Sequence, residues 1–153
     1  MNKFTRYFLI LLAVILLWNT YLVKPLKIFT VFLHELGHVL MAFLFGYGIQ
    51  SFNVNINESG HVVAASKGWF SSFMIANGGY LESVFFAVLI LYLGRTKFKN
   101  FIPGILAIVF SAICLKFSGF SFALFYAVCF GIVVIIIYMI NKPEVIDWFI
   151  DIV

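Results

Sequence analysis

The fold is decided by residues 28–47, which read IFTVFLHELGHVLMAFLFGY. The stretch is about as long as the roughly 20 residues that a helix needs to cross the hydrocarbon core of a bilayer. It contains two histidines and one glutamate near its middle and is otherwise almost entirely apolar. Lys24-Pro25 stands before it, and Gly46 and Gly48 are typical of a helix end. We therefore predict a membrane-spanning helix that carries ionisable side chains at depth.

Outside this stretch, further apolar runs indicate that the whole chain is embedded in a membrane. Hydrophobic residues make up 64% of the 153 residues and charged residues only 10%, whereas a soluble domain has roughly 25% charged residues. We predict an all-α membrane protein with a single membrane-embedded domain, 1–153, and a bundle of about five transmembrane helices. The predicted spans are 7–23, 28–47, 69–93, 101–117 and 120–140, the third interrupted at Asn77-Gly78-Gly79.

Residues 51–65 follow a different pattern. Apolar Phe52, Val54 and Ile56 alternate with polar residues, and the turn sequence Asn57-Glu58-Ser59-Gly60 comes next. This alternation predicts one short β-hairpin after the second span. The hairpin must lie in a protein-buried or water-lined place, because lipid cannot satisfy an open sheet edge. Residues 143–153 predict an interfacial helix.

The charge pattern indicates the partners. The net charge is +4, and lysines and arginines mostly stand between the apolar runs. This placement favours contact with the lipid bilayer and its anionic headgroups, and no basic stripe with interleaved aromatic residues indicates nucleic-acid binding. Cys114 and Cys129 lie inside apolar runs, where we expect them to pack rather than form a disulfide framework. The sequence leaves open whether the chain forms a homo-oligomer.

The motif that carries chemistry is His34-Glu35-Leu36-Gly37-His38. Residues i and i+4 share one face of a helix, so both imidazoles can reach the same zinc ion. Glu35 can contact a zinc-bound water without being a ligand, and can act as the general base. Such side chains are costly within a membrane unless they are paired or bound to something. We therefore predict a Zn²⁺ site at His34 and His38, with Glu35 as the catalytic residue.

These residues resemble the site-2 protease family of intramembrane zinc metalloproteases, and most of all its small bacterial branch. The matching features are Phe32 to His38, the polar hairpin, and Gly79-Tyr80-Leu81 in the third span. The resemblance implies a metalloprotease that hydrolyses peptide bonds of a membrane protein or peptide substrate. It also implies a multi-pass protein of the cytoplasmic membrane of a prokaryote.

Substrate contacts are predicted on both sides of the motif. Asn77 and Gly79 allow close backbone approach, which suits either a substrate strand near the metal or tight helix packing. The resemblance implies that the hairpin holds the unwound substrate by edge pairing, which adds Phe52 and Val54 to the predicted substrate-binding residues.

The chain departs from the family pattern in two places. The family takes its third zinc ligand from an aspartate in a later helix, often within Leu-Asp-Gly, whereas residues 101–140 contain no Asp, Glu or His. Glu82 stands where the small branch usually has glycine, and Ser83 where many relatives have asparagine.

Because a catalytic zinc uses three protein ligands, another residue must complete the site. We predict Glu82, the only other acid within an apolar span. Asp147 and Asp151 in the tail and His61 on the hairpin are the alternatives. The missing aspartate also keeps open a non-catalytic metal-binding scaffold or chaperone. Retention of Glu35 favours the enzyme, because a purely structural site needs no base.

Overall fold

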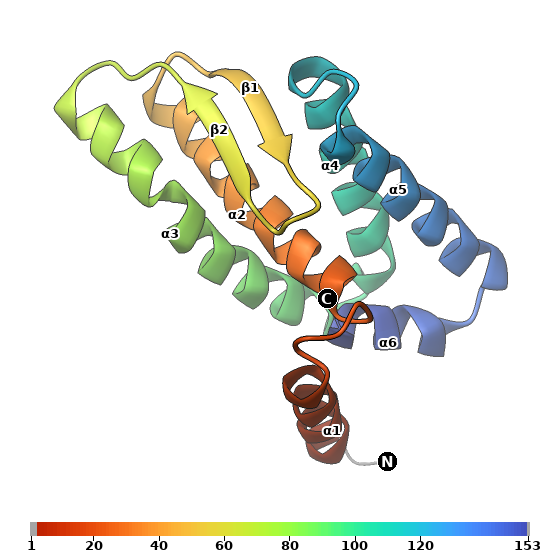
Figure 1. Cartoon of the computed structure of the whole chain (residues 1–153). Helices are drawn as coiled ribbons and strands as arrows, with labels where there is room; N and C mark the ends of the chain where they lie inside the picture. The colour runs from red at the N-terminus through yellow and green to blue at the C-terminus, as the bar shows by residue number, and fades with distance from the viewer. Residues whose placement is uncertain (1–2, 153) are drawn as a thin grey trace.

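The computed structural model describes residues 3–152 and is mostly helical (Figure 1). The helices are α1 (Lys3–Leu16), α2 (Lys24–Phe45), α3 (Trp69–Leu93), the short 3-10 helix η1 (Lys99–Phe101), α4 (Ile102–Phe117), α5 (Phe122–Ile140) and α6 (Pro143–Ile152). Among these residues, four segments are long and apolar enough to cross a membrane: α2, α3, η1 with α4, and α5. The chain is therefore a multi-pass membrane protein with the predicted fold class.

Helix α1 is shorter than the first predicted span, 7–23. It ends at Leu16, and residues 17–23 form turns. Its 14 residues extend about 21 Å at 1.5 Å per residue, less than the roughly 30 Å of a hydrocarbon core. The hydroxyl of Thr20 donates to the carbonyl oxygen of Leu17, an alternative to helix bonding that short polar side chains favour. Thus α1 is a short apolar helix beside four long spans.

Helices α2 and α3 pack against each other more closely than any other pair of helices in the described residues. Helix α2 begins at Lys24, before the predicted residue 28, because Pro25 fits the first turn of a helix. Helix α3 continues unbroken through residues 77–79, so the predicted interruption there is wrong. The glycines serve close packing instead: a Cβ on Gly37 would lie 2.7 Å from the carbonyl oxygen of Gly78.

The predicted hairpin is present between α2 and α3. It consists of β1 (Ile49–Val54) and β2 (Gly60–Ala64), which are antiparallel with Phe52 opposite Val62 and Val54 opposite Gly60. Both strands lie against α2, and Figure 1 shows β1 towards α4 and β2 towards α3. Phe52 and Val54 are fully buried, so one face of β1 packs in the protein core, as predicted for a hairpin near a membrane.

The core is centred on α2 and is rich in phenylalanine. The ring of Phe32 packs against those of Phe52 and Phe110, and Phe29 stacks on Phe130. These contacts join α2 to the hairpin, α4 and α5, while α3 covers another side of α2. Because α2 is packed on several sides, the middle of this helix is the least lipid-exposed part of the long spans.

Candidate metal centre

The two histidines of the motif lie one turn apart on α2 and converge. Their Nε2 atoms are 3.2 Å apart. Two nitrogens bound to one tetrahedral zinc at about 2.0–2.1 Å would be about 3.3–3.4 Å apart. The side chains of His34 and His38 are therefore spaced to hold one ion between them.

Helix α3 orients one of the two rings. Nδ1 of His38 lies 2.7 Å from the carbonyl oxygen of Ile75. A carbonyl oxygen only accepts, so Nδ1 carries the hydrogen, and in the neutral ring Nε2 keeps a free lone pair. Histidines that bind metals commonly donate their other ring N–H in this way. The hydrogen bond to Ile75 thus holds His38 in an orientation and a tautomer that can bind zinc through Nε2.

Gly79 leaves room for the two imidazoles beside the backbone of α3. A Cβ on Gly79 would lie 2.5 Å from Nε2 of His34 and 2.6 Å from Nε2 of His38. No side chain fits there without moving an imidazole, so the backbone of α3 forms one wall directly beside both nitrogens. Gly79, predicted as a substrate contact, lies directly beside both histidines of the motif.

Glu35 lies on the side of α2 that faces the hairpin and is only 5% exposed. A Cβ on Gly60 would lie 2.6 Å from Cγ and 2.7 Å from Oε1 of Glu35, so the first residue of β2 lies against the carboxyl group. Glu35 and His34 open into one cleft of about 410 Å³. Its lining consists of Thr30, Val31, His34, Glu35, Glu58, Gly60, Tyr80 and Ser83.

Tyr80 and Gly60 also belong to this site, although neither was predicted as a site residue. The Tyr80 ring lies edge-on to His34, with 4.8 Å between the ring centroids, and its place in the Gly79-Tyr80-Leu81 motif was the signal that could have identified it. Gly60 was placed in a turn, and only the register of the hairpin brings it to Glu35.

The predicted third ligand lies on the face of α3 that packs against α2. Gly78, Gly79 and Glu82 share this face, and the Cβ of Glu82 lies 2.6 Å from where a Cβ on Gly37 would be. Within residues 3–152, however, no group of three histidine, cysteine or acidic side chains is close enough to hold a metal ion. The structure thus places Glu82 at the right helix interface without joining it to the histidine pair.

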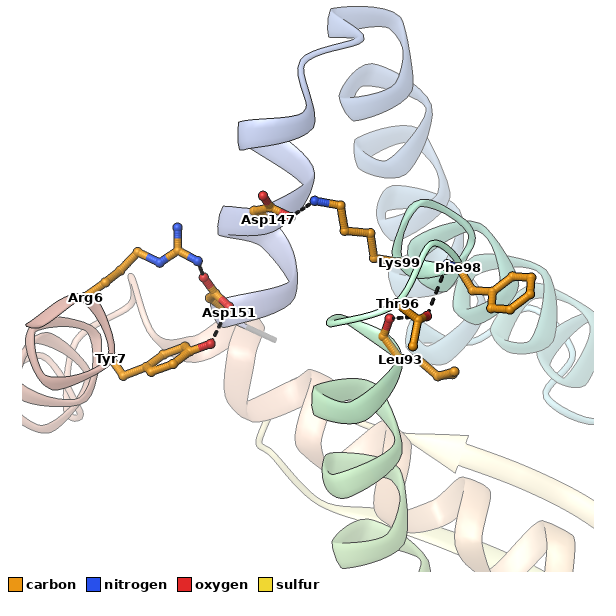
Figure 2. Close-up of polar contacts among 8 residues, drawn as sticks. All are labelled: Arg6, Tyr7, Leu93, Thr96, Phe98, Lys99, Asp147 and Asp151. Atoms are coloured by element: carbon orange, nitrogen blue, oxygen red, sulfur yellow. Dashed lines mark hydrogen bonds and ion pairs between the residues drawn. The ribbon is translucent and has the colours of Figure 1, made fainter. Parts of the chain in front are cut away.

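The other candidate ligands have different contacts. Asp151 pairs with Arg6, and Asp147 pairs with Lys99 (Figure 2). His61 lies beside the side-chain amide of Asn53, across the hairpin.

The predicted substrate contacts divide in two. The side chains of Phe52 and Val54 are 0% and 1% exposed and pack in the core, so they present no surface to a substrate. Asn77 is exposed and donates a hydrogen bond to the carbonyl oxygen of Phe73. The open part of the hairpin is instead the outer edge of β2: in the described residues β2 pairs with β1 alone, whereas α4 and α5 pack against β1.

Comparison with known proteins gives one match. A family model described as Peptidase M50B-like matches residues 7–153, nearly the whole chain. No curated protein and no solved structure matches the chain significantly.

Proposed function

We propose that this chain, which belongs to the Peptidase M50B-like family, is a zinc-dependent intramembrane protease that cleaves peptide bonds of membrane-associated substrates. The observation that carries the proposal is the pair of Nε2 atoms 3.2 Å apart on His34 and His38, with Glu35 opening into the same cleft as His34. Zinc, when bound, supplies a Lewis acid and lowers the pKa of a water molecule to about 7.

Glu35 acts first as the general base and then as the general acid of this reaction. Its carboxylate accepts a proton from the water as the water oxygen attacks the scissile carbonyl carbon. The same proton then passes to the amide nitrogen as the C–N bond breaks, so the carboxylate is regenerated. Gly60 has no Cβ, which leaves room for the carboxyl group of Glu35 beside the start of β2. A base held close to the reacting atoms contributes through proximity as well as through proton transfer.

Strand β2 is suited to hold the substrate. A membrane-spanning helix has its backbone groups paired internally and must unwind locally before its peptide bonds can be attacked. The outer edge of β2 offers unpaired backbone groups to such an unwound segment. Because β2 begins at Gly60, beside Glu35, a segment paired along this edge would pass the catalytic base. The hairpin would therefore contribute its backbone, and not Phe52 or Val54, to substrate binding.

Glu82 is our proposed third ligand. A catalytic zinc uses three protein ligands, and Glu82 lies on the same face of α3 as Gly79, which borders both imidazoles. Glu82 is partly buried and belongs to the membrane-length apolar helix α3, where an acid without a partner is costly. Its binding to zinc would require the side chain to turn towards the histidine pair.

A Glu35→Gln variant tests the proposal. Purified wild type and variant, both loaded with zinc, are compared on a panel of single-span model substrates in detergent or proteoliposomes. We expect the variant to keep its zinc and to lose activity by about 10²-fold or more, since it cannot accept the proton. A zinc-loaded wild type that cleaves no faster than the variant would overturn the proposal that this chain is a protease.

That outcome would favour the second candidate, a non-catalytic metal-binding scaffold or chaperone. One feature of the sequence favours it already: residues 101–140 lack the aspartate that the family uses as a zinc ligand.

A further inference from the structure

A polar cavity of about 420 Å³ lies apart from the metal centre, where α1, α6 and the segment after α3 meet. It shares no lining residue with the cleft at Glu35. Three cations line it, Arg6, Arg95 and Lys99, together with two acids, Asp147 and Asp151. The cavity therefore has a net positive charge of one.

The two acids are already neutralised, and each orients a cation. Lys99 pairs with Asp147 (Figure 2), and Arg6 pairs with Asp151, which also accepts a hydrogen bond from the hydroxyl of Tyr7. In contrast, Arg95 takes part in no ion pair within residues 3–152. Since each acid is paired with another cation, no acid in the cavity balances the positive charge of Arg95.

Arg6 also has donor capacity left over. Its Nε is buried and has no hydrogen-bond partner among the described residues, and the same holds for Oδ2 of Asp151 although the two residues form an ion pair. Asp151 therefore does not satisfy the whole guanidinium group. A buried donor without a partner is costly, and an arginine has five N–H donors in a planar fork. Such forks match the oxygens of a phosphate group particularly well. The donors of Arg6 and Arg95 thus indicate an oxyanion of this class.

The position of the cavity indicates where that phosphate comes from. Arg95, Lys97 and Lys99 directly follow the membrane-length helix α3, which ends at Leu93. On α6, the Trp148 ring lies under the guanidinium of Arg6, with 5.1 Å between Cζ and the ring centroid, and tryptophan is enriched at the level of lipid headgroups. Apolar Leu91 and Ile150 also line the cavity. A cavity that is cationic, partly apolar and at a span's end fits a lipid headgroup better than a free ion.

We propose that this cavity binds the phosphodiester headgroup of an anionic phospholipid, with Arg95 and Arg6 as donors to the phosphate oxygens. Bound lipid would hold α1 and α6 against the end of α3. This site is independent of the proposed protease, because none of its residues belongs to the metal centre.

The test uses the full chain, stripped of lipid in a neutral detergent and titrated with dioctanoyl phosphatidylglycerol. Native mass spectrometry counts the lipids bound per chain. We expect one tightly bound phosphatidylglycerol, and weaker binding of dioctanoyl phosphatidylcholine, whose charge is zero. Phosphatidylcholine that binds as tightly would overturn the requirement for an anionic lipid. Inorganic phosphate that displaces the lipid at millimolar concentration would overturn the lipid as the source.

Two variants locate the binding. Arg95→Gln should weaken phosphatidylglycerol binding by about tenfold or more, the effect of losing one charge-assisted hydrogen bond. Lys97→Gln is the matched control: it removes the same charge two residues away, and Lys97 lies over the Phe98 ring and not in the cavity. It should leave binding unchanged. Both side chains are exposed, so neither change should alter the thermal unfolding midpoint. Equal losses in both variants would overturn the site and indicate only a diffuse basic surface.

Discussion

His38 on α2 donates a hydrogen bond from Nδ1 to the carbonyl oxygen of Ile75 on α3, at 2.7 Å. The acceptor is a backbone atom, so the direction of the imidazole depends on where α3 lies relative to α2. The separation of the two helices depends in turn on three glycines at their interface, Gly37, Gly78 and Gly79. Substitution of these glycines should therefore affect the metal centre before it affects distant parts of the fold.

Gly79→Ala should remove zinc while the chain stays folded. The new methyl group would lie 2.5 Å from Nε2 of His34 and 2.6 Å from Nε2 of His38, so the imidazoles must move out of their present spacing. We expect zinc affinity to fall by at least about 10- to 100-fold, which is the range seen when groups that orient metal ligands are changed. Zinc per chain, measured by elemental analysis after dialysis against a weak chelator, checks this.

Gly131→Ala is the matched control for that experiment. Gly131 lies in α5, and nothing is within 4 Å of a Cβ placed there. Alanine also has the higher helix propensity. The control should keep full zinc content and equal or greater stability. Loss of zinc in both variants would mean that helical glycines matter in general, and not the space beside the imidazoles.

Gly37→Ala should lower stability as well as zinc affinity. Its methyl group would meet the Cβ of Glu82 at 2.6 Å and the carbonyl oxygen of Gly78 at 2.7 Å. Both atoms are fixed to the backbone of α3, so the two helices must move apart. Overpacking of this kind costs about 1–3 kcal/mol, which thermal unfolding in detergent measures. An unchanged unfolding midpoint would show that α3 adjusts without cost.

Gly60→Ala should separate catalysis from metal binding. Here the methyl group would meet Cγ and Oε1 of Glu35 at 2.6 and 2.7 Å. These atoms belong to a flexible side chain, so the carboxyl group moves and the histidines stay in place. We expect full zinc content with kcat reduced by up to about 10²-fold, as for other small misplacements of reacting groups. Val63→Ala, at an exposed position of the same strand, should change neither quantity. Zinc loss in Gly60→Ala would argue that Glu35 is a ligand.

Much of the fold was predictable because its causes are local. Run length and hydropathy predicted the four long spans within a few residues, and polar alternation predicted the hairpin. The family expected from the motif was confirmed over residues 7–153. Local patterns gave a wrong prediction where packing against another helix decides the structure. Residues 77–79 resemble a break in isolation, but glycines inside α3 allow α2 to approach.

The site was predictable only in part for a similar reason. The i, i+4 spacing correctly brought His34 and His38 together, because helix geometry alone determines that distance. The alternation around Phe52 and Val54 identified a strand but not which face it would bury, because that depends on packing against α2 and α4. The contact of Gly60 with Glu35 likewise depends on tertiary structure, which no spacing in the sequence encodes.

Glu82→Ala tests the third ligand. If Glu82 completes the site, its removal leaves only two histidines, which rarely hold zinc against water. Zinc occupancy and activity should then fall together, in contrast to Glu35→Gln, which should lose activity alone. Asp147→Ala is the control for loss of an acid, because Asp147 pairs with Lys99, and a surface ion pair contributes only about 0–1 kcal/mol. It should keep both zinc and activity. One zinc per chain in Glu82→Ala would exclude Glu82 and make His61 or a second subunit the leading source of the ligand.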